Sequence, residues 1–551
     1  MLATNTNFDT YHALDYKTPM YLIHFDGEAT DYCNHQPGSP DNALKQYVIS
    51  VKGRGQSVTP EEGKSTIGDI TFELLDYNDE ITALIATDTY YFHRKKTTLK
   101  WGYLGMDEAD MLSVTGWITG MKLSVSGLKY TFNMTDPKKW MQRQIFRGSE
   151  DTAVTVQGNP IDIFLRCLTS TGAGTNGDYD WYAAENGVGL DDDFINVASI
   201  EAVRDDWFPG DSHRISITIN ERIKAIDFFE TEIFRLLNVY LTIDGDGKIN
   251  LKPVKPPLAA YTEVQSFNED CFRDLPELDM NLDSLINEVN FSYNWDSTDN
   301  EFDNEVFYLD STSIANRGPG KKALKIESKG LHTDLSPASL ASRALYIMER
   351  RKTAVFGRFA TPPIKISANC HFSRMISEAG DIVPVTHSKL PDLESGTRGI
   401  SAKRMEIISL DPTWPSEHSS GGVKVKLLDT GFARSIYQVI SPTMTITGVT
   451  DRTHFAVSAA DAAKYAYFTN PEVQVCMAHM RQRVANITLT SVNASTGAIV
   501  CDDPGLDLQI GWIVLFADYD NCTSEQKNYG FIADTSNNLG AADDDAHLIC
   551  P

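Results

Sequence analysis

The sequence predicts a mainly β protein with an α+β insertion, and three observations support that fold class. Apolar and polar residues alternate with a period of two in the first 150 residues and again beyond residue 285, which is typical of half-buried strands. Between these regions, from about residue 158, apolar residues recur at helical spacing. After residue 441, short apolar runs separated by turns rich in Asp, Asn and Gly indicate a small β domain.

Length and composition limit the class of protein. A chain of 551 residues has room for about three or four domains, and its 42% apolar and 10% aromatic content is enough for ordinary cores. There are 49 basic against 75 acidic residues, so the formal net charge is −26. A surface with this charge repels phosphate backbones. The composition therefore argues against a nucleic-acid-binding protein.

The sequence also bears on where the protein is made. Residues 1–23 carry Asp and Asn where a secretory signal needs a basic segment followed by an apolar core. No stretch reaches the roughly 18 consecutive apolar residues of a membrane-spanning helix. The eight cysteines include no CxxC pair, which favours reduced thiols. We therefore expect a soluble protein without an export signal or a membrane-spanning segment.

The first segment, residues 1–155, is predicted to be mostly β. In Gly-Asp-Ile-Thr-Phe-Glu-Leu-Leu-Asp at 68–76, Ile70, Phe72 and Leu74 share one face of a strand. Ser126-Gly127 separates two further alternating runs and suits a tight hairpin turn.

The second segment, residues 156–262, is predicted to be an α/β domain. Pro160 precedes a short helix over 161–168, and an apolar stripe predicts a second helix over 225–237. The stretch 240–251 predicts a hairpin built on Asp-Gly, and the prolines that follow place a boundary near 260.

The third segment, residues 263–438, is predicted to return to strands around one helix. Ser336-Pro337 supplies an N-cap and a first-turn proline for a helix that should end before Gly357. Strands are predicted at 285–293, 364–366, 382–385 and 422–429. The last of these resembles 68–76 in pattern, which indicates either a weak internal repeat or two unrelated amphipathic strands.

The fourth segment, residues 439–551, is predicted to be a small acidic β domain, with 13 acidic against 5 basic residues from position 441 on. It contains Cys476, Cys501, Cys522 and Cys550, soft ligands that could in principle meet around zinc or an iron–sulfur cluster. Because their spacing carries no signature, buried free thiols are the favoured interpretation.

Several short stretches match functional sequence motifs only in part. The GxGxxG match at 172–177 follows a predicted helix instead of a strand, so a flexible loop is favoured over a pyrophosphate site. Gly63-Lys-Ser65 has the end of a P-loop, but Val58 stands where its first glycine should be. The Gly-Asp-Ser-His at 210–213 is better explained by a turn than by an esterase block.

A calcium loop is also disfavoured. Asp244, Asp246 and Gly247 imitate part of one, but Pro253 stands where a closing carboxylate is needed, so a hairpin turn is favoured. No HExxH, GxSxG or paired-carboxylate block stands out. The sequence therefore predicts no catalytic, cofactor-binding or metal-binding residue, no cofactor and no enzymatic activity.

Basic residues gather at 93–96, at 138–143 and at 350–352. A solvated face is the favoured interpretation, and contact with the acidic surface of a neighbouring subunit is the alternative.

The order of these segments resembles the tail hub (baseplate hub) proteins of long-tailed bacteriophages and gene transfer agents. The resemblance covers residues 20–435, and it is carried by the stretch 68–76, by Gly-Trp-Ile-Thr-Gly at 116–120 with the hairpin to Phe132, by 285–293 and by Gly-Asp-Ile-Val-Pro at 380–384. None of these is a specific short motif.

The resemblance implies two tube-like β-barrel domains in one chain, near 20–150 and 263–435, with the α/β domain inserted between them. It implies a homotrimeric ring in the virion tail tip, assembled in the host bacterial cytoplasm, that adapts sixfold to threefold symmetry. The implied partners are the distal tail protein ring, tail tip or fibre proteins and the tape measure protein. DNA would pass through the channel during ejection without specific binding, which suits a negative wall.

Under this interpretation nine residues are expected in the cores of the tube-forming sheets: Ile70, Phe72, Leu74, Leu123, Val125, Val289, Phe291, Val423 and Val425. The rival hypothesis is a carbohydrate-binding or carbohydrate-cleaving receptor-recognition tail protein. Asp205-Asp206-Trp207 and Trp181-Tyr182 would serve that function, since such proteins use aromatic rings and acid pairs on sugars.

Overall fold

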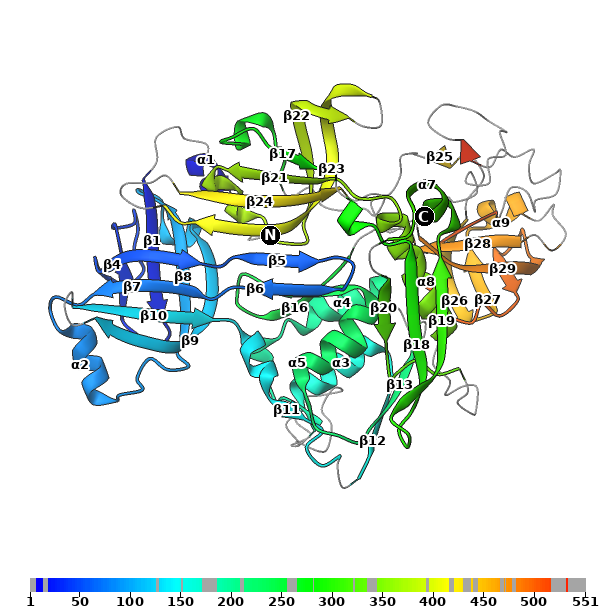
Figure 1. The fold of residues 1–551 in the computed structure, drawn as a ribbon, viewed down its shortest axis with the longest axis horizontal. Coiled ribbons are helices and arrows are strands. Elements are labelled where there is room, and N and C mark those ends of the chain that lie inside the picture. The colour runs from blue at the N-terminus through cyan, green and yellow to red at the C-terminus, as the bar shows by residue number, and fades with distance from the viewer. Residues whose placement is uncertain are drawn as a thin grey trace.

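A computed structural model describes most of the chain, and Figure 1 shows its arrangement in several β-rich parts around a helical centre. The described residues are 6–12, 18–124, 128–149, 152–170, 186–208, 213–254, 265–280, 282–320, 323–333, 344–392, 396–415, 421–429, 438–439, 444–465, 470, 472–477, 482–516 and 532–533.

The first β module is an eight-stranded sheet in the order β3-β2-β1-β8-β9-β10-β7-β4. The edge strands β3 and β4 are separated by only two residues, so the sheet curls into a nearly closed barrel around a core of aromatic and aliphatic side chains. Helices α1 (Thr6–His12) and α2 (Glu80–Thr87) accompany it. The strands, in sheet order, are Ala43–Lys45, Thr30–Cys33, Pro19–Phe25, Lys96–Tyr103, Leu112–Ser124, Lys129–Thr135, Ile70–Leu75 and Val48–Gly53.

The second β module is a curved sheet whose two ends are connected by backbone bridges. Strands β22, β23, β24 and β21 follow one another, and β17 pairs with β21. Backbone bridges from Phe272 to Cys370 and from Phe267 to Val385 then connect β21 back to β22. The strands are β17 Glu277–Asp279, β21 Lys365–Cys370, β22 Ile382–Asp392, β23 Thr397–Thr413 and β24 Gly422–Asp429.

One hydrophobic core is shared by the two β modules, because buried side chains from both belong to the same cluster. A second core joins the inserted helices to the C-terminal part. The two modules are therefore in direct contact through buried side chains.

The insertion packs helices against short hairpins in the second core. Asn159 caps α3 by accepting a hydrogen bond from the Ile161 amide at 3.0 Å, and Pro160 occupies the first turn, as the sequence predicted. The second predicted helix is also confirmed, as α5, a π-helical turn and α6 in succession. The bounds are β11 Gln144–Ile145, β12 Val154–Gly158, α3 Pro160–Thr169, α4 Val197–Trp207, β13 Ile215–Ile219, β14 Ile223–Lys224, α5 Ala225–Phe229, the π turn Glu230–Phe234, α6 Arg235–Leu237, β15 Val239–Ile243 and β16 Ile249–Pro253.

A three-stranded sheet in the order β19-β18-β20 lies beside the insertion with α7 and α8. Its bounds are β18 Glu288–Asp296, β19 Glu301–Leu309, α7 Ser311–Arg317, β20 Leu324–Glu327 and α8 Ala344–Phe359. The helix predicted from Ser336 is present as α8, and its predicted start lies outside the described residues. The prediction that it ends before Gly357 was wrong, because α8 continues to Phe359, which packs its ring into the core.

The C-terminal part is a closed barrel in the order β26-β27-β30-β29-β28-β31, drawn in orange in Figure 1. The predicted small β domain is thereby confirmed. Its elements are β26 Met444–Asp451, β27 His454–Val457, α9 Ala459–Tyr465, β28 Glu472–Met477, β29 Gln482–Val492, β30 Ala498–Cys501 and β31 Ile513–Phe516, with the pair β25 Gln438–Val439 and β32 Ile532–Ala533 beside it. Among the described helices, none combines the length and apolar character needed to cross a membrane.

The mainly β fold class with a helical insertion is confirmed. The hairpin predicted at Ser126-Gly127 is confirmed by the pairing of Ser124 with Lys129, although the turn itself lies outside the described residues. Strands β7 and β24, the two halves of the suggested repeat, each lie between two neighbours inside a module wall. Whether they derive from a repeat stays a prediction.

Candidate functional site

The feature that joins the two β modules is a long hairpin, residues 48–75, which we call the bridging hairpin. Its outer strands β4 and β7 belong to the first module. Its inner strands β5 (Gln56–Thr59) and β6 (Lys64–Ile67) extend the sheet of the second module, because Gln56 and Ser57 pair with Leu410 and Ser409 of β23. One continuous element therefore contributes strands to both walls (Figure 1).

The hairpin bends where it leaves the first module. Gly53 has φ of +91°, and a Cβ there would lie 2.1 Å from the Asp69 carbonyl oxygen, so only glycine fits. Arg54 is also left-handed, with φ of +67°. Backbone hydrogen bonds from Arg54 to Asp69 at 3.1 Å and from Gly68 to Gly55 at 2.7 Å keep the two strands paired through the bend.

Aromatic side chains pack next to the bend, in the region where the two β modules meet, which we call the junction. The Trp414 indole donates to the Gly53 carbonyl at 2.9 Å, and the Tyr21 hydroxyl donates to the Pro415 carbonyl at 2.8 Å. The rings of Tyr21 and Trp414 meet edge to face with centroids 5.7 Å apart. Burial raises the pKa of Tyr21 well above its ordinary value, so this phenol stays neutral and can donate.

A buried ionic cluster lies at the same junction. Lys252 of β16 places Nζ 2.7 Å from Asp381 Oδ1 and 3.7 Å from Glu378 Oε2. Arg54 approaches the other oxygen of Glu378 at 3.8 Å. Burial alone would lower the pKa of Lys252, but the attraction of Asp381 and Glu378 raises it instead. The cluster connects the bridging hairpin, the insertion and the loop before β22.

A second polar cluster lies among the insertion, β23 and α8. The Tyr240 hydroxyl donates to Glu406 Oε1 at 2.9 Å, and Arg358 of α8 forms a short ion pair with the other carboxylate oxygen. Arg351 donates through Nε to the Arg235 carbonyl at 3.0 Å, and through its guanidinium to the Glu61 carbonyl of the bridging hairpin. These side chains are buried, so the contacts with their partners must offset the free-energy cost of removing their polar and charged groups from water.

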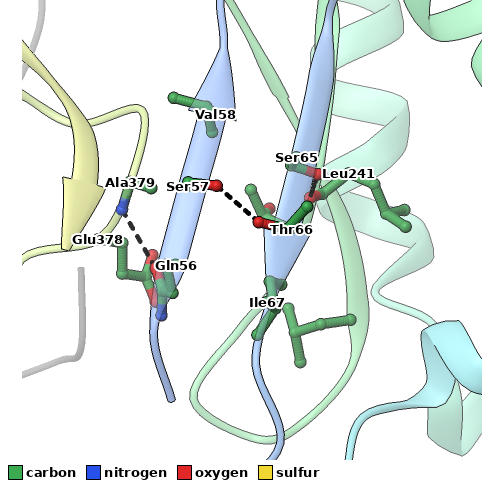
Figure 2. Close-up of a pocket in the computed structure, with 11 residues that line it drawn as sticks. Gln56, Ser57, Val58, Ser65, Thr66, Ile67, Leu241, Glu378 and Ala379 are labelled. Atoms are coloured by element: carbon green, nitrogen blue, oxygen red, sulfur yellow. Dashed lines mark hydrogen bonds between the residues drawn. The ribbon is translucent and has the colours of Figure 1, made fainter. Parts of the chain in front are cut away.

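Figure 2 shows the small cavity between the bridging hairpin, β15 and the loop at 378–379. Ser57 and Thr66 hydrogen-bond across the hairpin at 2.6 Å, and Ser65 donates to the Leu241 carbonyl. The Ala379 amide donates to Gln56 Oε1 at 3.1 Å. The cavity volume is about 10 Å³, the size of one water molecule. This site can hold parts of the protein together, but it has no room for a substrate.

The expected sheet-core residues are mostly placed as predicted. Ile70, Phe72 and Leu74 of β7 are buried, as are Val423 and Val425 of β24. Leu123 was wrongly predicted, since it is 46% exposed at the end of β9 beyond the core, and Val125 lies outside the described residues.

Val289 and Phe291 are fully buried, but in β18 of the three-stranded sheet. They contribute to the core shared with the insertion, not to the wall of a β module. Their prediction as buried residues of a sheet is confirmed, and their place in a tube-forming sheet stays a prediction. Alternation identified a half-buried strand but could not identify the sheet that contains it.

The weak chemical motifs are accounted for in part. Asp244 Oδ1 accepts hydrogen bonds from the amides of Asp246 and Lys248, which confirms the hairpin turn between β15 and β16. Gly63 packs against the Phe234 carbonyl, where a Cβ would come within 2.5 Å. The GxGxxG stretch and Gly210 to Ser212 lie outside the described residues. His213 is buried, and burial lowers its pKa well below the ordinary value.

The C-terminal cysteines are only partly described. Cys501 is a buried free thiol, and burial raises its pKa to about 12. Cys476 lies in β28, while Cys522 and Cys550 lie outside the described residues. Within the described residues, no group of three or more His, Cys, Asp or Glu side chains could hold a metal ion.

Three residues of the basic clusters are used inside the protein, while His93, Arg94, Lys139 and Arg143 are exposed. Lys95 forms a close ion pair with Glu28, and Lys138 donates to the Ser65 carbonyl at 2.8 Å. Arg351 is buried in the junction. The interpretation of these clusters as solvated faces was therefore wrong for these three residues.

Of the residues named for the rival function, the structure describes only Asp205, Asp206 and Trp207. Trp207 is buried at the end of α4, and Asp205 pairs with Arg204 at 2.7 Å. Trp181 and Tyr182 lie outside the described residues.

Comparison with known proteins gives matches among solved structures alone: no family model matches the sequence, and no curated protein matches it. The 43 kDa tail protein of prophage MuSo2 from Shewanella oneidensis is 13% identical, with 74% of this chain and 98% of that chain covered and a TM-score of 0.38. A tail protein from Neisseria meningitidis is 12% identical, with 75% and 98% covered and a TM-score of 0.37.

The virion of a native gene transfer agent contains a chain that is 11% identical, with 72% of this chain and 86% of that chain covered and a TM-score of 0.26. These three solved structures are two tail proteins and a gene transfer agent virion, which agrees with the family that the sequence resembles.

Proposed function

We propose that this chain is a non-enzymatic structural protein of a phage-type tail, a hub in which three copies form a ring around the DNA channel. In this proposal the two β modules of each chain alternate around the ring. Three chains then present six modules to a sixfold tail tube above and threefold symmetry below. The four-part division of the chain at 155, 262 and 438 belongs to the same proposal.

The observation that carries the proposal is the rigid union of the two β modules. The bridging hairpin contributes strands to both, and the Arg54–Glu378 ion pair and the Tyr21–Trp414 ring contact hold the two modules against each other. A ring subunit needs such a fixed angle, because a hinged pair of modules would not close reproducibly around an axis. The hydrophobic core that the two modules share also restricts their movement relative to each other.

The charge of the chain supports the channel role. With a formal net charge of −26, a lumen lined by this protein gains little from phosphate contacts, and DNA can slide past without being held. We propose no catalytic residue, cofactor or metal. The ring would lie at the tail tip of the virion, assembled in the bacterial cytoplasm between the distal tail protein ring, the tape measure protein and tip or fibre proteins.

One pocket in the structure has a lining that could suit the rival carbohydrate function. An open pocket of about 250 Å³ is lined by Trp295, Asp296, Asp303, His332 and neighbouring hydroxyl groups. However, Lys329 Nζ lies over the Trp295 ring at 4.4 Å, and Phe302 contacts the same ring at 4.8 Å. The aromatic face that sugar stacking requires is therefore partly covered.

Imaging tests the proposed function. Negatively stained particles of the purified protein, and of native tails that contain it, should show a threefold ring with six similar densities around a channel. Compact monomers with measurable glycan affinity, and no ring in the tail particle, would overturn the hub in favour of the rival.

A further inference from the structure

Two exposed apolar patches lie on the outer parts of the two β modules. The far-end patch of the first module consists of Ile49, Tyr77, Leu123 and Leu128, which are 44–56% exposed. The edge patch of the second module consists of Leu275, Met280 and Leu282, which are 52–67% exposed. Clusters of exposed large apolar side chains are uncommon on monomeric proteins and indicate binding surfaces.

The residues of the far-end patch gather at one end of the neighbouring strands β4, β7, β10 and β9. The Asp76 amide next to Tyr77 donates to the Leu128 carbonyl at 2.9 Å, and Leu123 lies opposite Tyr130 across the same hairpin. The Tyr77 ring packs on Tyr47 with centroids 5.0 Å apart, and Ile49 follows two residues later on β4. The patch thus occupies the end of the β4–β7 pair opposite to Gly53, where the second module is attached.

The edge patch follows the open side of β17. This strand pairs with β21 on one side, and within the described residues no strand pairs with its other side. Leu278 faces the core, whereas Glu277 and Asp279 face outward. An unpaired edge with exposed apolar residues next to it is suited to contact with another chain.

The existing junction shows what kind of partner fits. Within one chain, the first module joins the second by placing β5 beside β23 and by packing Tyr21 and Trp101 against Trp414 and Phe372. Each module therefore already binds a module of the other type on one side. The two patches remain on their unattached parts, and because they differ from each other, a contact between them is head-to-tail and can close into a ring.

The two patches differ in the charge of their rims. Lys122 and Lys129 flank the hairpin tip of the far-end patch, where Lys129 also lies 3.8 Å from Glu73 of its own chain. The exposed carboxylates Asp274, Glu277, Asp279 and Asp283 flank the edge patch. Charged rims of opposite sign around an apolar centre are the ordinary arrangement of a specific protein interface.

We propose that the edge patch of one copy binds the far-end patch of the next copy, so that this pair of surfaces forms the contact between protomers. This inference rests on the proposed ring and names the surfaces that would close it. The partner is a second copy of this chain, and each copy uses one patch of each kind in a complete ring.

The test uses two double variants of the full chain. The far-end variant carries Leu123→Glu and Leu128→Glu, and the edge variant carries Met280→Glu and Leu282→Glu, so that the two mutated surfaces repel each other. All four side chains are about half exposed, so the fold should survive, which circular dichroism and the thermal midpoint check. The control is Ile510→Glu, which changes an apolar residue that is 68% exposed on the C-terminal barrel, outside both patches.

Mass photometry and sedimentation velocity give the readout. The wild type and the control should have three times the 61.2 kDa chain mass, and each double variant alone should be a monomer. An equal mixture of the two variants should form a dimer and nothing larger, because the intact edge patch of one meets the intact far-end patch of the other. That selective complementation would distinguish a head-to-tail contact from a self-complementary one.

Three results would overturn the inference. These are double variants that remain trimeric, an edge variant that dimerises by itself, and a wild type that is monomeric at tens of micromolar. In each case a threefold ring in images of the tail particle would still support the proposed function. Absence of that ring, with the patches nevertheless pairing in solution, would instead overturn the hub and leave the contact between the patches standing.

Discussion

Lys252 and Asp381 form a buried ion pair, with Nζ 2.7 Å from Oδ1, although 129 residues of sequence separate them. Lys252 belongs to the insertion and Asp381 to the loop before β22, so the pair fastens the insertion to the second β module. Asp381 is buried and Lys252 is partly buried, with its side chain 20% exposed, and each charge is compensated chiefly by the other.

Replacing Asp381 by Ala should therefore destabilise the protein strongly. The change leaves the Lys252 ammonium buried beside the more distant Glu378, and breaking a buried pair in this way costs about 3–5 kcal/mol. Urea unfolding followed by tryptophan fluorescence measures the loss. The control is Lys325→Ala, which removes an exposed pair with Glu327 and should change the free energy of unfolding by at most about 1 kcal/mol. Equal effects of the two substitutions would contradict a structural role for the buried pair.

Gly53→Ala should loosen the connection between the two β modules. Gly53 combines a φ of +91° with a Cβ position 2.1 Å from the Asp69 carbonyl oxygen, so alanine meets both backbone strain and a clash with the paired strand. The matched control is Gly27→Ala, where φ is +79° and nothing lies within 4 Å of the added Cβ. The free energy of unfolding of the control should fall only by the cost of placing alanine at a positive φ, about 1–2 kcal/mol.

We expect Gly53→Ala to lose more than the control and to increase amide hydrogen exchange in β5, where the hairpin pairs with β23. If exchange in β5 is unchanged while overall stability falls, the bend at Gly53 does not control how the hairpin attaches to the second module. This measurement separates a local effect on the junction from a general loss of stability.

Elements that depend on local residue order could be predicted from the sequence. The alternation in β7 placed Ile70, Phe72 and Leu74 correctly, and Asn159-Pro160 marked the start of α3. The signals are local because side-chain direction alternates along a strand and because capping groups lie within three residues of the amides that they bind.

The junction could not be predicted in the same way, because its partners meet only in the folded chain. Gln56 contacts Ala379 across 323 positions, and Trp414 reaches Gly53 across 361. Lys252, between Leu251 and Pro253, reads as an ordinary outward-facing residue of a strand, and only the folded structure brings Asp381 to it. Leu123 was misplaced for a related reason: alternation gives the face of a strand, not the point at which the strand leaves the core.

Glu232→Gln should change how stability depends on pH. Glu232 is buried in the π-helical turn and accepts a hydrogen bond from Ser328 at 2.7 Å. Burial raises its pKa to about 7, against an ordinary value of about 4.3, and the hydrogen bond from Ser328 opposes that rise only in part. The folded protein therefore keeps this proton over a pH range in which the unfolded chain has already released it.

The sign of the effect follows from proton uptake. Between about pH 4.3 and pH 7 the folded state binds more protons at this group than the unfolded state does, so its contribution to stability falls as the pH rises and is constant above pH 7. The full loss is on the order of 3 kcal/mol. Glutamine carries no charge, so the variant should gain stability relative to wild type as the pH is raised from 4 to 8. Urea midpoints across that range measure the difference, and parallel curves for the two proteins would show that Glu232 titrates normally in the folded state.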